Sequence, residues 1–107
     1  MRKFISAAAL AAALVSSSAL AAWPEKDITV IVPYGPGGST DNTFRSVEPA
    51  LEEALGRSIT IENIGGGSGL IGTAKGLKAR PDGYTFVVVP TSTMASIYTR
   101  QMPYDVD

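Results

Sequence analysis

The chain has 107 residues, 45% of them apolar, with a formal net charge of −1, no cysteine and no histidine. A near-neutral chain without a basic patch is poorly suited to nucleic acid, because phosphate backbones are bound by concentrated positive charge. Without histidine the chain lacks the commonest general base and metal ligand, which disfavours hydrolase and zinc chemistry. Without cysteine there are no disulfides.

The first 21 residues have the pattern of a secretory signal peptide. Arg2 and Lys3 supply a positive start, residues 4–14 form an alanine-rich apolar run, and Ala19-Leu20-Ala21 is an A-x-A cleavage pattern. A membrane anchor is the competing interpretation, but spanning a bilayer needs about 20 apolar residues. We predict cleavage after Ala21, export to the periplasm, and a mature part, residues 22–107, that is not embedded in a membrane.

The first expected unit is a strand, a glycine-rich turn and a helix. Residues 28–32 are β-branched almost throughout, and residues 33–41 (PYGPGGSTD) form the turn. We expect the helix to begin within residues 39–41, which are all acceptable N-caps, and to end at Gly56. Pro49 predicts a bend in this helix, because proline lacks the amide that continues the hydrogen-bond ladder.

The second expected unit repeats this order. A strand over residues 58–63 leads into a glycine run at 65–69, which opens a helix over about 70–79. Gly72 and Gly76 lie four positions apart in that helix. Glycine weakens a helix by about 1 kcal/mol relative to alanine, but the absence of side chains predicts that the helix lies close against the sheet.

The third expected unit begins at a turn, Pro81-Asp82-Gly83. Proline presets φ, aspartate bonds to nearby backbone, and glycine adopts positive φ. Residues 84–89 are nearly continuously apolar, which predicts a buried strand of a parallel sheet. Pro90 ends the strand, and Thr91-Ser92-Thr93 is expected to cap a third helix that continues to residue 98.

This alternation predicts the α/β class, with a doubly wound parallel sheet in the strand order 2-1-3. In such a sheet a crevice lies at the carboxyl ends of the strands, where the connections diverge. The first glycine turn and residues 91–93 fall at this crevice, and the second glycine run flanks them. Signals at three strand ends therefore predict one binding site.

The chemistry predicted for this site is anion capture by the backbone. A turn that opens a helix leaves N–H groups without partners where the helix dipole is positive, so it attracts a carboxylate or phosphate. Asp41 is open to two interpretations, as a helix N-cap or as an acceptor for a ligand ammonium or hydroxyl group. Tyr34 is likewise either a core residue or a wall of the pocket.

The glycine runs have other interpretations. Residues 67–72 fit the dinucleotide pattern G-x-G-x-x-G, but they follow the second strand and no acidic residue closes the next one. Neither glycine run continues into the Lys-Ser or Lys-Thr of a phosphate-binding P-loop. In the competing interpretation the glycines serve only tight turns, yet residues 65–69 contain more glycine than a turn needs, which favours close approach of a ligand.

A series of short motifs also carries a family likeness. The motifs are Trp23-Pro24, Lys26, Ile28, Val32-Pro33-Tyr34, Pro36-Gly37-Gly38, Asp41, Leu55-Gly56, Glu62-Asn63, the glycine run, Pro81-Asp82-Gly83-Tyr84 and Met102-Pro103-Tyr104-Asp105. In this order and spacing the chain resembles the extracytoplasmic solute receptors of tripartite tricarboxylate transporters, the Bug or TctC-like family.

The resemblance implies a two-domain clamshell of the periplasmic-binding-protein type, of which residues 22–107 would be the N-terminal part of domain 1, with the second domain absent from this chain. It implies that small carboxylates are held by backbone amides of residues 34–41 and 65–70, and that a membrane permease is the partner. Thr91 and Ser92 match polar residues of the family after the third strand.

These arguments predict a periplasmic carboxylate receptor, not an enzyme, with no catalytic residue, metal or cofactor. The predicted ligand-binding residues are Tyr34, Gly37, Gly38, Ser39, Thr40, Asp41, Gly66, Gly67, Ser68, Gly69, Leu70, Thr91 and Ser92. The alternatives are an exported α/β hydrolase, with Ser39, Ser68 or Ser92 as nucleophile, and a truncated remnant without function.

Overall fold

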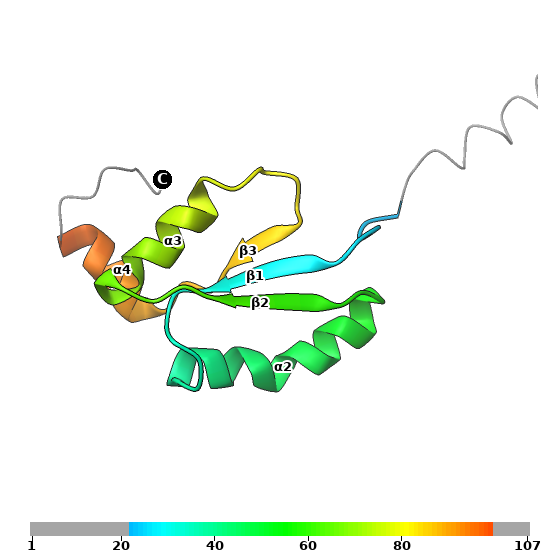
Figure 1. The fold of residues 1–107 in the computed structure, drawn as a ribbon, viewed down its shortest axis with the longest axis horizontal. Helices are drawn as coiled ribbons and strands as arrows, with labels where there is room; N and C mark the ends of the chain where they lie inside the picture. The colour runs from blue at the N-terminus through cyan, green and yellow to red at the C-terminus, as the bar shows by residue number, and fades with distance from the viewer. Residues whose placement is uncertain (1–21, 100–107) are drawn as a thin grey trace, which may run out of the picture.

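A three-stranded parallel sheet flanked by helices forms the centre of the computed structural model, which describes residues 22–99 (Figure 1). The strands β1 (Ile28–Val32), β2 (Ile59–Asn63) and β3 (Thr85–Val87) lie in the order β2-β1-β3. The α/β class and the predicted 2-1-3 order are therefore confirmed. The predicted signal peptide and the motif at residues 102–105 lie outside the described residues.

The central strand β1 forms most of the core. It pairs with β2 from Ile28–Ile59 to Val32–Asn63, and with β3 from Thr29 to Ile31. Because β1 is the central strand and both faces of the sheet are covered by helices, its apolar side chains are almost fully removed from water. The paired strands run in the same direction, so their carboxyl ends lie at one edge of the sheet.

Two helices cover opposite faces of this sheet (Figure 1). Helix α2 (Ser39–Leu55) packs its Phe44 and Leu55 side chains against the buried cluster of β1 and β2. Its N-cap is Gly38, one position before the predicted range, and its C-cap is Gly56 at φ +67°, as predicted. The helix continues through Pro49 without an interruption.

Helix α3 (Leu70–Leu77) lies very close to the other face, as its glycines predict. A Cβ atom added at Gly72 would come within 2.6 Å of the Ile64 carbonyl oxygen. A Cβ atom at Gly76 would overlap the Val87 side chain of β3. The short 3-10 helix η2 (Gly67–Gly69) precedes α3, and helix α4 (Thr91–Thr99) follows β3.

The third strand exists, but the prediction that it is buried and covers residues 84–89 is wrong in extent and in burial. Strand β3 has three residues, and Phe86 is 45% exposed. Within residues 22–99, β3 is an edge strand that pairs with β1 alone, and its side next to α2 opens into an apolar groove lined in part by Phe44, Leu51 and Val88. No helix within these residues is long and apolar enough to cross a membrane.

Candidate functional site

The segments that follow all three strands meet at the hydroxyl group of Tyr34. This oxygen lies 3.1 Å from the Ser68 carbonyl oxygen, 2.9 Å from Thr93 Oγ1 and 3.3 Å from Ser92 Oγ. The Thr93 hydroxyl also donates to the Ser68 carbonyl at 3.2 Å. The predicted convergence of the turn after β1, the loop after β2 and the start of α4 is therefore present, with Tyr34 as its link.

A polar hollow of about 440 Å³ opens beside this link. It is lined by Tyr34, Gly35, Pro36, Gly38, Ser39, Thr40 and Ser92. No lining side chain carries a charge. Thr91 begins α4 next to the hollow but is not part of its lining.

The first turn of α2 supplies backbone donors at this hollow. The first helical hydrogen bond runs from the Asn42 N–H to the Gly38 carbonyl. The amides of residues 39–41 therefore precede the ladder and have no intrahelical acceptor. At a helix N-terminus these N–H groups and the helix dipole together attract negative charge.

The Gly37 amide, by contrast, is already used within the protein. It donates to Asp41 Oδ2 at 2.9 Å. This bond resembles a capping box, in which a side chain in the first helical turn reaches back to a backbone N–H before the helix. The expectation that Gly37 offers its amide to a ligand is therefore wrong for this conformation, while no acceptor within residues 22–99 takes the amides of Gly38 and residues 39–41.

The carboxylate of Asp41 is turned into the protein. The residue is 1% exposed, and Asp41 accepts hydrogen bonds from Asn63 Nδ2 at 2.8 Å, from the Gly37 N–H at 2.9 Å and from Arg45 Nε at 2.9 Å. The Asn63 bond, followed by those from Gly37 and Arg45, lowers the pKa of Asp41 to about 2. Asp41 is thus neither the N-cap residue nor a free acceptor, since all of these donors belong to the protein.

The second glycine run takes backbone shapes that side chains disfavour. Gly66, Gly67, Ser68 and Gly69 all have positive φ, and Ser68 is the one non-glycine residue with positive φ among residues 22–99. The Gly69 and Leu70 amides donate to the carbonyls of Gly66 and Gly67 respectively. These two predicted donors are therefore occupied, whereas the amides of residues 66–68 have no backbone acceptor among the described residues.

Gly69 has a different role at the site. A Cβ atom there would clash with Thr93 Oγ1 and lie 3.1 Å from the Tyr34 hydroxyl. The glycine thus allows the second loop to close on the Tyr34 link. At Gly69, therefore, the close approach is between two segments of the same chain, whereas the sequence predicted close approach of a ligand.

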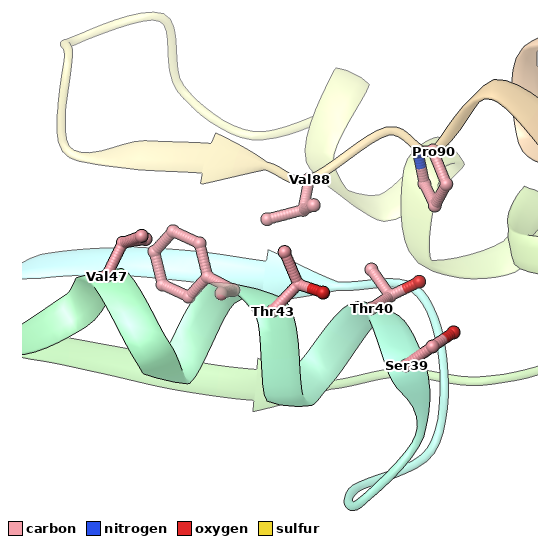
Figure 2. A pocket seen from close by; sticks show the side chains of 7 residues that line it. Ser39, Thr40, Thr43, Val47, Val88 and Pro90 are labelled. Atoms are coloured by element: carbon pink, nitrogen blue, oxygen red, sulfur yellow. The ribbon is translucent and has the colours of Figure 1, made fainter.

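A second apolar groove, distinct from the one beside β3, adjoins the hollow along α2 (Figure 2). It shares Ser39 and Thr40 with the hollow. Figure 2 shows Thr43 and Val47 of α2 lying opposite Val88 and Pro90, which follow β3. The site therefore has a polar end at the helix N-terminus and an apolar extension of about 340 Å³.

Three residues that shape the site were not among the predicted ligand-binding residues: Arg45, Asn63 and Thr93. Asn63 ends β2 at the same sheet edge as the two glycine turns, so its position at a strand end could have predicted it as a site residue. Thr93 was placed at the crevice as part of a helix cap but not among the ligand-binding residues, and it is fully buried against Tyr34. Among residues 22–99 no group of three or more acidic side chains is placed to hold a metal ion.

Comparisons with known proteins agree with this architecture. The family described as "Tripartite tricarboxylate transporter family receptor" matches residues 43–107. Protein BugT of Bordetella pertussis is 34% identical over 94% of this chain and 29% of its own length. The chain belongs to the TctC receptor family.

Solved structures of this family's fold are similar as well. One described as a periplasmic transporter has a TM-score of 0.72 and 42% identity, covering 78% of this chain and 29% of the other. The R. palustris protein Rpa4515, solved with adipate, has a TM-score of 0.59 and 39% identity over 62% of this chain and 22% of its own. The TctC-family chain described here thus spans about a third or less of the length of these relatives.

Proposed function

We propose that this chain forms the ligand-capturing first part of a periplasmic receptor for a small organic carboxylate, which serves a tripartite tricarboxylate transporter. Residues 1–21 act in this proposal as a cleaved signal peptide, and residues 22–107 as the start of domain 1. Membership of the TctC family supports the class of function. The adipate bound to a similar protein supports the ligand class.

The proposed mechanism is capture without chemistry. Amides of Gly38 and of residues 39–41 donate to one carboxylate group, with residues 66–68 and the hydroxyls of Thr40 and Ser92 nearby. A hydrogen bond to a charged group contributes about 1.5–3 kcal/mol. Closure of a second domain over the ligand would complete the site and present a surface to the permease.

One observation carries the proposal: amides of the α2 first turn that have no acceptor within residues 22–99 adjoin a hollow, and the segments that follow β1 and β3 both contribute to this hollow. The neutral lining suits this chemistry, because backbone dipoles bind an anion without a charged side chain. Arg45, the nearest arginine in the described helix, is paired with Asp41.

The hydrolase alternative finds less support at the same residues. Within residues 22–99, no carboxylate hydrogen-bonds to the hydroxyl of Ser39, Ser68 or Ser92. A serine nucleophile needs an adjacent base, and these 107 residues contain no histidine. The nearest partner of Ser92 Oγ is the Tyr34 hydroxyl.

A binding screen tests the proposal. The purified protein is titrated with mono-, di- and tricarboxylates and with matching amides, and binding is followed by calorimetry and by thermal shift. We expect at least one acid to bind and to raise the melting temperature, while its uncharged amide does neither. Stabilisation by a nucleotide with no response to any acid would contradict the receptor function.

A further inference from the structure

We infer that Asp41 is a positioning residue that joins the two glycine turns of the site, and that it does not itself contact the ligand. The first turn comprises residues 33–38 and the second residues 64–69. This inference rests on the proposed function as far as ligand binding is concerned. The structural coupling that it describes is measurable without any ligand.

The two turns are coupled through the carboxylate of Asp41 and the side-chain amide of Asn63. Asp41 Oδ2 accepts the Gly37 N–H of the first turn, and Asp41 Oδ1 accepts Asn63 Nδ2. Asn63 is the last residue of β2, immediately before the second turn. Its amide nitrogen also donates to the Tyr34 carbonyl at 3.1 Å, so both ends of the link reach the first turn.

The burial of Asp41 favours a positioning role over direct contact with a ligand. Asp41 is 1% exposed and does not line the hollow. Arg45 compensates its charge from the same helix, four residues on. A buried carboxylate whose two oxygens both accept hydrogen bonds has no reason to turn outward, because leaving those donors unpaired is costly.

Loss of the carboxylate should therefore loosen both turns. In Asp41→Asn the side chain keeps its shape but replaces one acceptor oxygen with an NH2 group. This NH2 group would face either Asn63 or the Gly37 and Arg45 donors. At least one donor pair is then mismatched, and the amides of the α2 first turn lose the support that orients them toward the hollow.

Amide hydrogen exchange of the ligand-free protein tests the coupling. We expect Asp41→Asn to speed exchange severalfold at Gly37 and also at Ile64 and Gly69, whose N–H groups bond to Val32 and Gly66. The Thr29 amide, which bonds to Tyr84, should be unaffected. Glu53→Gln is the matched control, since Glu53 is an exposed acid of the same helix.

A second variant guards against an Asp41→Asn protein that does not fold. Asn63→Ala leaves the Asp41 bonds to Gly37 and Arg45 in place and removes the Asn63 side-chain bonds to Asp41, to the Tyr34 carbonyl and to Arg45 Nη2. Faster exchange at Gly37 in this variant supports coupling. Exchange that changes only at residues 64–69 overturns it, as does an Asp41→Asn protein in which Ile64 and Gly69 are unchanged.

A pair of matched acids separates positioning from direct contact. Succinate and aspartate differ by one ammonium group. A positioning role predicts that Asp41→Asn weakens both by the same factor, about tenfold. Selective loss of aspartate would mean that the carboxylate holds the ammonium, and would overturn the inference. If neither these nor any other acid binds the unmodified protein, the proposed function fails, while hydrogen exchange still decides the coupling.

Discussion

Ser39 allows one backbone donor to be removed from the site without removing the helix that carries it. The residue occupies the first position of α2, where its N–H has no intrahelical acceptor. Proline is well tolerated at this position, because it lacks only an amide that the helix does not use. The preceding Gly38 has φ −76° and ψ 176°, the extended conformation that a residue before proline prefers.

The expected effect of Ser39→Pro follows from the loss of one charge-assisted hydrogen bond. Such a bond contributes about 1.5–3 kcal/mol, which corresponds to a loss of affinity of about 10- to 140-fold. The free energy of unfolding should change little, because no helical hydrogen bond is lost. The assay is calorimetric titration with an acid that binds the unmodified protein, together with denaturant unfolding.

Ser39→Ala is the control, since it removes the hydroxyl and keeps the amide. If Ser39→Ala weakens binding as much as Ser39→Pro, the hydroxyl and not the backbone is the donor. If Ser39→Pro folds normally and binds as tightly as the unmodified protein, capture by the first turn of α2 is refuted.

Three further predictions concern the framework of the site. Tyr34→Phe should lower the free energy of unfolding by about 1 kcal/mol, because it removes the hydroxyl group shared by three segments. Tyr98→Phe, at a 72% exposed position, is the control and should leave the free energy of unfolding unchanged. Denaturant titration compares the two variants. Gly76→Ala should destabilise the protein by about 1–3 kcal/mol despite the better helix propensity of alanine, because the added methyl group overlaps Val87. Adding Val87→Ala in the same chain should restore part of this loss. If the losses of stability in the two single variants simply add in the double variant, the overlap is contradicted. The pKa of Asp41 is lowered to about 2 from 3.8, so the contribution of its carboxylate to stability is complete above about pH 4 and is lost as the pH falls toward 2. Asp41→Asn should flatten this part of a curve of unfolding free energy against pH. An unchanged slope would contradict the lowered pKa of Asp41.

Local patterns predicted the elements well because their causes are local. The β-branched run at Ile28–Val32, the glycine at position 56 and the turn at Pro81-Asp82-Gly83 act through φ preferences and neighbouring hydrogen bonds. In the turn, Asp82 Oδ1 accepts the Tyr84 N–H, as the turn chemistry requires. The strand order followed from the same elements, because right-handed crossovers leave few arrangements.

The detailed predictions of the site were less accurate where partners come from distant residues. Gly37, Gly69 and Leu70 were expected to offer amides to a ligand, but acceptors within the protein take all three. The exposure of Phe86 also differs from its prediction, because burial of an edge strand depends on what lies beside it.

The sequence by itself determined where strands, turns and helices occur, and it predicted backbone amides at strand ends as the binding chemistry. Only the tertiary structure decided which amides are free and that Asp41 faces inward. The physical reason is that a hydrogen-bond donor is available only if no acceptor reaches it. Asp41 and Asn63 are 22 residues apart, and Tyr34 and Thr93 are 59 apart, so their partnership exists only once the sheet has brought the strand ends together.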